Sequence, residues 1–260
     1  MIPAHSSVSL PEVRRLEAVS FRSWPAATTR FDGTWAIRLT AGHTAKRLNS
    51  LNPLDPADHS NLDERISRAA RAFQAFGRPL VFRQSPLAPP ELENRLDARG
   101  WRRFDETNVM TLDLEKAADS TIDHLPYSNI GHWIDQSVAM GSIAADLKPG
   151  LSELIARVQG EVALFLSEDA NGTPLAAAMA VRFGDLAGLF EIASHPSHRR
   201  QGNARKLIKS ALSWAQSGGA SRAWLQVVAD NEPAVELYQS LGFTEIYSYA
   251  YRQAPEGFNG

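Results

Sequence analysis

A basic turn that contains a glycine precedes a helix-like stretch in the segment HPSHRRQGNARKLIKSALSWA, residues 195–215. Arg199, Arg200 and Arg205 place positive charge where a helix is expected to begin. The first turn of a helix has unpaired backbone N–H groups and the positive end of the helix dipole, so acidic side chains are favoured there. Arginines at this end, with Gly202 to let a ligand approach the main chain, indicate a phosphate or pyrophosphate site.

Two familiar phosphate-binding patterns do not fit this turn. A P-loop needs a second glycine and a Lys-Ser/Thr pair, and the dinucleotide fingerprint needs three glycines. The turn has one glycine and no such pair. The helix that follows has one apolar stripe and is expected to end at Gly218-Gly219, so it should pack on a sheet with its N-terminus open.

Two side chains outside the turn have types suited to acid–base chemistry. Glu191 interrupts the apolar segment LAGLFEIAS, and a carboxyl group among buried neighbours has a raised pKa that suits a general base. Strict strand alternation leaves the alternative that Glu191 is exposed, with Phe190 and Ile192 facing the other way. Tyr238 has a phenol group that can donate a proton. Its spacing also places it on the apolar face of a helix.

No metal site is expected. His195 and His198 share one loop, but further ligands are not evident and the chain has no cysteine, so we expect a solvated pair.

The composition is that of one large or two ordinary globular domains. The 260 residues are 43% hydrophobic and 22% charged, with a formal net charge of -2. This balance argues against a general nucleic-acid or membrane-surface binder, and no apolar run reaches transmembrane length. The lack of cysteine fits a reducing compartment, and the N-terminal stretch lacks the pattern of a secretory signal. We therefore expect a cytoplasmic protein, with a homodimer left open.

The periodicity predicts the same order of elements twice: a hairpin, a strand, a helix, a strand, a helix that ends in Gly-aromatic, and a strand. The two hairpin turns are Asp32-Gly33 and Asn171-Gly172. The two helix ends are Gly100-Trp101 and Gly242-Phe243. The repeated order suggests an internal duplication.

Alternating strands and helices favour an α+β (α/β layered) fold in each half. We expect a first domain at residues 1–115 and a second at 129–260. Residues 116–128 are polar and mixed, and are expected to form the linker.

The second half resembles the GNAT N-acetyltransferase superfamily, roughly from Gln159 to Tyr251. Arg199-Arg200-Gln201-Gly202-Asn203-Ala204 is similar to the family pattern Arg/Gln-x-x-Gly-x-Gly/Ala, and it follows a strand as that pattern requires. Asn231-x-x-Ala234-x-x-Leu237-Tyr238, followed by Gly242-Phe243, resembles the second family signature. The resemblance implies two GNAT-like mixed-sheet domains with flanking helices. It also implies an N-acetyltransferase that transfers acetyl from acetyl-CoA, as co-substrate, to an amine acceptor by direct attack in a ternary complex.

The same resemblance implies roles for individual residues. The pyrophosphate would lie on the basic turn, and the pantetheine arm would pair with the strand Leu186–Ser194. The strand Ser221–Ala229 would splay away to leave a cleft. Tyr238 would be the general acid, and Glu191 would be a base acting directly or through water. The implied cofactor-binding set is Ile192, Ala193, Ser194, Arg199, Arg200, Gln201, Gly202, Asn203, Ala204, Arg205, Asn231 and Tyr238.

Two rival functions remain open. One is a transferase that uses another acyl-CoA or another acceptor. The other is a non-catalytic acyl-CoA-binding sensor or scaffold. The acceptor is expected to be a small molecule.

The first half resembles the family only in its order of elements, as a degenerate copy. Where the basic turn should lie it has LDPADHSNLDERI, which lacks glycine and carries acids that would repel a pyrophosphate: Asp55, Asp58, Asp63 and Glu64. Aligning the two Gly-aromatic ends puts Leu96 where Tyr238 stands. We expect one acetyl-CoA per chain, and a first half that shapes the acceptor pocket or braces the second half. Candidates for that pocket are Arg47, Asn49 and Asn52.

Overall fold

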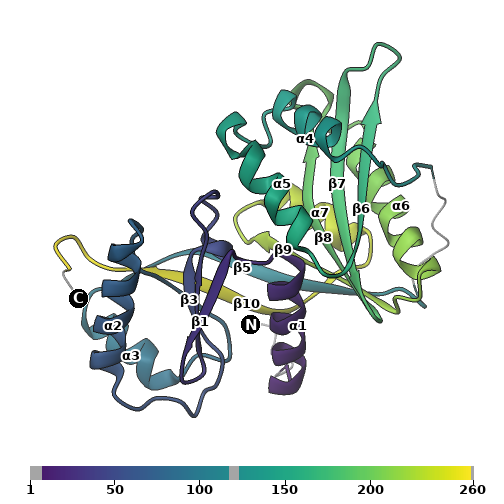
Figure 1. Ribbon diagram of the computed structural model, residues 1–260. Helices are drawn as coiled ribbons and strands as arrows, with labels where there is room; N and C mark the ends of the chain where they lie inside the picture. Colours follow the sequence, from purple (N-terminus) through teal and green to yellow (C-terminus); the bar gives the residue numbers. More distant parts are fainter. Residues whose placement is uncertain (1–7, 117–122, 259–260) are drawn as a thin grey trace.

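The computed structural model describes residues 8–116 and 123–258, and its strands form one continuous mixed sheet (Figure 1). The strand order is β1-β2-β3-β4-β10-β5-β9-β8-β7-β6. The strands are β1 (Thr28–Asp32), β2 (Trp35–Leu39), β3 (Ser50–Pro53), β4 (Val81–Gln84), β5 (Arg102–Asp113), β6 (Glu161–Glu168), β7 (Pro174–Phe183), β8 (Leu186–Ser194), β9 (Arg222–Val228) and β10 (Thr244–Gln253).

Helices flank the sheet, so the predicted fold class, a layered α+β fold, is confirmed. They are α1 (Leu10–Ser23), α2 (Leu62–Ala75), α3 (Pro90–Ala98), α4 (Ile130–Ala139), α5 (Lys148–Arg157), α6 (Asn203–Ser217) and α7 (Glu232–Ser240). Short 3₁₀ turns are η1 (Lys46–Leu48), η2 (Ala145–Leu147) and η3 (Pro196–His198). No helix within residues 8–116 and 123–258 is long and apolar enough to cross a bilayer.

The two halves have the predicted order of elements. The first runs β1-β2 hairpin, β3, α2, β4, α3 and β5, and the second runs β6-β7 hairpin, β8, α6, β9, α7 and β10. One difference is local. In the first half the residues before β3 form η1, and pairing with β2 begins only at Ser50, so β3 is short.

The final strands of the two halves lie together in the middle of the sheet. β10 pairs with β4 of the first half, β5 pairs with β9 of the second half, and β5 and β10 pair with each other (Figure 1). Each half is therefore completed by a strand from the other. The boundaries expected at 115 and 129 stay a prediction, and residues 117–122 of the expected linker lie outside the described residues.

Apolar clusters cover both faces of the sheet. One lies between the second half and α6 and α7, and another contains residues of α1, α4 and α5. Helix α1 comes from the first half but contacts β7 and β8 of the second. A buried ion pair between Glu17 of α1 and Arg83 of β4, with the Tyr247 hydroxyl donating to Glu17 at 2.7 Å, ties this helix to β4 and β10. Buried charges need such pairing to offset their desolvation.

The helices α3 and α7 end in the same way. Gly100 and Gly242 have φ values of +71° and +95°, the left-handed region that glycine adopts most readily. The aromatic residue after each glycine donates its backbone N–H to a helix carbonyl, from Trp101 to Leu96 and from Phe243 to Tyr238, both at 3.0 Å. Leu96 and Tyr238 therefore occupy equivalent positions, as aligning the two helix ends predicts.

Candidate active site

The sheet opens between β8 and β9. Their parallel ladder runs from the pair Leu186 and Arg222 to the pair Leu189 and Leu225. Beyond it, β8 stays paired with β7 on its other side as far as Ser194. Main-chain groups of β8 after Leu189 that face β9 therefore have no ladder partner. This is the place where the resemblance expects the pantetheine arm to bind.

Glu191 lies on a β-bulge at this opening. On β7, Met179 opposes Phe190 and Ala177 opposes Ala193, so two residues of β8 stand against one of β7. Glu191 has a φ of +47°, and strict alternation does not hold at this point. Its side chain is 23% exposed and is therefore mostly buried, not the solvent-facing residue that the alternative reading offered.

The environment of Glu191 acts on its pKa in two directions. Burial raises the pKa of the carboxyl group, and the Arg47 guanidinium, with Nη2 3.9 Å from Oε1, opposes that rise. Burial has the larger effect, so the carboxyl keeps its proton to a higher pH than an exposed glutamate does.

The basic turn forms an open helix N-terminus. Gly202 stands immediately before α6 with a φ of +82°, and Arg200 also has a positive φ of +63°. No side chain caps α6, and its first turn has no acidic residue. A Cβ built on Gly202 would meet no heavy atom within 4 Å, so the main chain is accessible from that side. The N–H groups that an anion would need are thus left available.

A cavity of about 980 Å³ joins the turn, the end of β8 and α7. All of the predicted cofactor-binding residues except Gln201 line it, and Gln201 is an exposed member of the turn. The cavity is lined by Ile192, Ala193, Ser194, Arg199, Arg200, Gly202, Asn203, Ala204, Arg205, Asn231 and Tyr238, with further residues of α7 and of the segment after α4. Its size suits a large organic ligand.

Tyr238 belongs both to the cavity wall and to the apolar core. It is 7% exposed and its ring meets that of Phe243 at 6.1 Å, edge to face. Burial raises the pKa of Tyr238 to about 12. This value is further from the pKa of a thiol than the pKa of a free phenol is. The hydroxyl is therefore protonated at neutral pH and can donate a proton, but it cannot act as a base there.

Other side chains near the turn have partners within the protein. Arg205 donates to the Ser240 hydroxyl at 2.7 Å, which links the start of α6 to the end of α7. His195 Nδ1 accepts from the backbone N–H of Ser197, and His198 lines the cavity. No cluster of three metal-ligating side chains occurs in the parts of the chain that the structure describes.

Part of the cavity wall was not predicted from the sequence. Met140, Gly141 and Ser142, at the end of α4 and just after it, also line the cavity. A glycine after a helix signals only a helix end, so their types gave no hint of a site.

The three first-half residues named as candidates for the acceptor pocket differ in their surroundings. Arg47 faces Glu191, but the two asparagines are buried and bond to the main chain around them. Asn49 accepts from the Thr40 N–H at 2.9 Å and donates to the His43 carbonyl at 2.7 Å. Asn52 donates to the carbonyls of Ala36 and Ser50.

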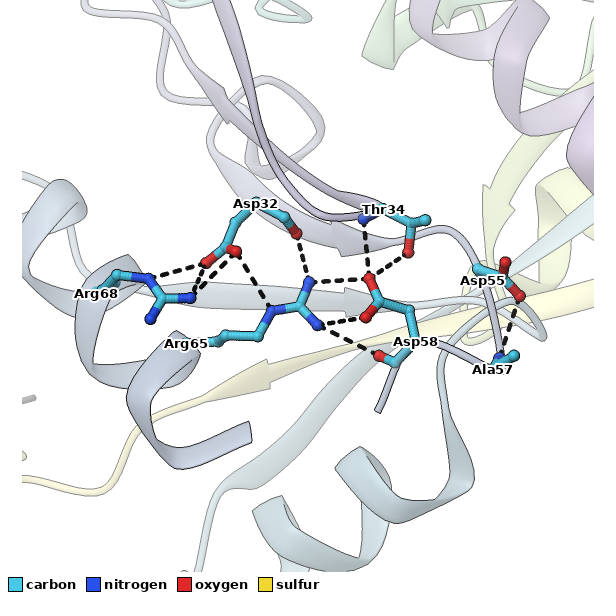
Figure 2. A network of polar contacts seen from close by, with 7 residues as sticks. All are labelled: Asp32, Thr34, Asp55, Ala57, Asp58, Arg65 and Arg68. Atoms are coloured by element: carbon cyan, nitrogen blue, oxygen red, sulfur yellow. Dashed lines mark hydrogen bonds and ion pairs between the residues drawn. The ribbon is translucent and has the colours of Figure 1, made fainter. Parts of the chain in front are cut away.

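The acidic loop of the first half is filled by its own ion pairs, as Figure 2 shows. Asp58 accepts hydrogen bonds from Arg65 at 2.7 Å and from the backbone N–H and hydroxyl of Thr34. These donors, Arg65 above all, hold the pKa of Asp58 far below its usual range. Arg65 is buried over the ring of Trp35 and also donates to the Asp32 carbonyl. This loop replaces the open turn of the second half with a closed network.

Sequence comparisons identify the family. The model of the family described as "Probable histone acetyltransferase Rv0428c C-terminal" matches residues 11–252. The "Uncharacterized N-acetyltransferase YobR" of Bacillus subtilis is 27% identical over 249 residues, which cover 94% of this chain and 99% of that one. The ribosomal protein bS18-alanine N-acetyltransferase of Escherichia coli K12 is 37% identical over 97 residues, which cover 37% of this chain and 66% of that protein.

Solved structures share the fold. A GCN5-related N-acetyltransferase from Kribbella flavida has a TM-score of 0.68 at 18% identity, over 94% of this chain and 96% of that one. A tandem GNAT protein from the clavulanic acid biosynthesis pathway has a TM-score of 0.64 at 15% identity, over 94% and 89% of the two chains. The family match spans both halves, and the chain therefore belongs to the Rv0428c C-terminal family of GNAT acetyltransferases and is a GNAT-type acyltransferase of tandem architecture.

Proposed function

We propose that this enzyme transfers the acetyl group of acetyl-CoA to the amine of a small-molecule acceptor, by direct attack in a ternary complex. The observation that supports it most is the single cavity that brings the open start of α6, the unpaired stretch of β8 and the Tyr238 side chain together.

The chain's own groups fit the donor. Backbone N–H groups of Gln201 to Ala204 would hold the pyrophosphate, with the side chains of Arg199 and Arg200 adding charge. Main-chain groups of Ile192 to Ser194 would pair with the pantetheine arm. The Asn231 side chain, which caps no helix N–H, would bond to the same arm or form the wall beside it.

The chemistry needs a base and an acid. The amine lone pair attacks the thioester carbonyl carbon, the N–C bond forms, and the C–S bond breaks. Glu191 would take the amine proton, directly or through water, and Tyr238 would give its hydroxyl proton to the leaving thiolate. The raised pKa of Glu191 makes it a stronger base than an exposed carboxylate.

Calorimetric titration with acetyl-CoA and release of free CoA across an amine library test this proposal together. We expect binding and amine-dependent release above background hydrolysis. Binding without release would identify a sensor or scaffold, and faster release from a longer acyl-CoA would identify a different donor. A cytoplasmic location and a homodimer stay predictions.

A further inference from the structure

Arg47 reaches the opening between β8 and β9 from the other half of the chain. Its guanidinium lies 5.0 Å from the centre of the Trp24 ring, and Trp24 stacks on Phe190 with ring centres 5.4 Å apart and an interplanar angle of 11°. Arg38 donates to the Arg47 carbonyl at 2.8 Å. The arginine is thus held in place next to Glu191, the residue after Phe190, before any ligand arrives.

The N–H donors of the Arg47 guanidinium are available to a ligand, whereas those of Arg65 and Arg83 are bonded within the protein. Arg65 and Arg83 each donate directly to carboxylates. Across residues 8–116 and 123–258, the Arg47 side chain forms no hydrogen bond, and its distance of 3.9 Å to Glu191 is too long for one. The side chain is 28% exposed, so a ligand can reach it. A partly exposed guanidinium without hydrogen bonds can bind a carboxylate through two parallel N–H donors.

The charges around the opening leave a positive excess. Arg38 is buried and donates to the carbonyls of Phe21, Trp24 and Arg47 but to no carboxylate. Burial, with the nearby Arg83, lowers its pKa to about 9, so it remains a cation at neutral pH. Arg38 therefore adds positive charge next to Arg47, and Glu191 is the one carboxylate within 4.0 Å of the Arg47 guanidinium among the described residues. Other charged groups nearby are paired with each other, Glu17 with Arg83 and Lys46 with Asp105.

We propose that Arg47 binds a carboxylate of the acceptor, and that the acceptors are small amines with a carboxylate close to the amino group, as in a free amino acid. This rests on the function proposed above. An amine bonded to Glu191 and a carboxylate bonded to Arg47 fit side by side when two or three bonds separate them, because the two protein groups are 3.9 Å apart. A lysine side chain in a protein, and the N-terminus of a peptide that does not begin with aspartate, have no carboxylate at that spacing.

Matched acceptor pairs test the proposal. Each of the common amino acids is compared with its carboxamide, which keeps the amine and side chain but removes the negative charge, and kcat/KM is measured by CoA release at saturating acetyl-CoA. We expect the enzyme to favour the amino acid by roughly 10- to 100-fold, the value of a hydrogen-bonded charge pair. Arg47→Gln should bring that ratio close to one. Arg47→Lys, which keeps the charge but loses the fork, should give an intermediate ratio, and Arg71→Gln, on the exposed side of α2, should retain the parent's ratio.

A binding measurement makes the test independent of turnover. The amino acid and the carboxamide are titrated into the enzyme saturated with CoA, with thermal unfolding used to show that each variant is folded. Equal affinity for the two compounds, or a preference that Arg47→Gln leaves unchanged, would overturn the carboxylate site. If acetyl-CoA binds and carboxamides or peptides are acetylated as fast as amino acids, only this inference fails. If acetyl-CoA does not bind at all, the proposed function fails with it.

Discussion

Replacing Gly202 with glutamate tests whether the start of α6 is the pyrophosphate site. The residue has a φ of +82°, and a Cβ there would point into open space, so the new side chain would stand where an anion would approach the N–H groups. Each charge-assisted hydrogen bond is worth about 1.5–3 kcal/mol, and the loss of one lowers affinity by roughly 10- to 100-fold. The added negative charge acts in the same direction. We therefore expect acetyl-CoA affinity to fall by about tenfold or more.

The strain of a side chain at positive φ must be separated from the loss of the site. It costs about 1–2 kcal/mol for a non-glycine residue wherever it occurs. Gly77→Glu is a matched control, because Gly77 follows α2 in the first half, has a φ of +71° and also has no heavy atom within 4 Å of a built Cβ. Both variants should lose similar stability in thermal unfolding, and only Gly202→Glu should lose affinity in calorimetric titration.

A folded Gly202→Glu protein that binds acetyl-CoA as tightly as the parent would refute a pyrophosphate site at the start of α6. An equal loss of affinity in both variants would also refute it, because strain and not the blocked turn would then be the cause.

Four further predictions concern the chemistry and the two halves. Tyr238→Phe keeps the ring packing but removes the proton donor. Turnover should therefore fall by roughly a hundredfold, while the acetyl-CoA affinity measured by calorimetry hardly changes. Equal turnover in variant and parent would show that Tyr238 only packs in the core. In a pH–rate profile, kcat/KM should rise with pH on a limb above the ordinary glutamate pKa, because burial keeps the proton on Glu191, and Arg47→Gln should move this limb higher by removing the opposing charge; a limb that does not move argues against Glu191 as the base. Titration should give one acetyl-CoA per chain, and the same affinity in Asp63→Ala, because the Asp63 carboxylate pairs with arginines at and just after the end of α3; two equivalent sites would contradict the closed network of Figure 2. A fragment of residues 1–115 should fail to unfold cooperatively in circular dichroism, because β4 and β5 both lose β10, and a cooperative transition would show that the first half folds alone.

Local signals were enough to predict most of the elements and the basic turn. Asp32-Gly33 and Asn171-Gly172 lie in hairpin turns, and Gly100 and Gly242 lie at helix ends with positive φ, as glycines in those places require. The open start of α6 could be found in the same way, since Gly202 and its arginines are neighbours in the sequence. Each of these features depends on residues a few positions apart.

The bulge at Glu191 and the meeting of Glu191 with Arg47 required the folded chain. Regular alternation predicts one orientation for a residue in a strand, and nothing in LAGLFEIAS marks the extra residue that β7 leaves unpaired. Arg47 and Glu191 are far apart in the sequence. They meet because α1 packs against β7 and β8, and Arg47 lies over the ring of Trp24, which follows α1.

The exchange of strands was also decided only by the tertiary structure. The apolar patterns of β5 and β10 would fit a neighbour from their own half as well as one from the other, because a strand's periodicity states which face is buried and not which strand lies beside it. The choice depends on the summed packing of both halves, including the buried Glu17–Arg83 pair that joins α1 to β4. A site built across that junction therefore arises from long-range contacts that no local stretch of the sequence contains.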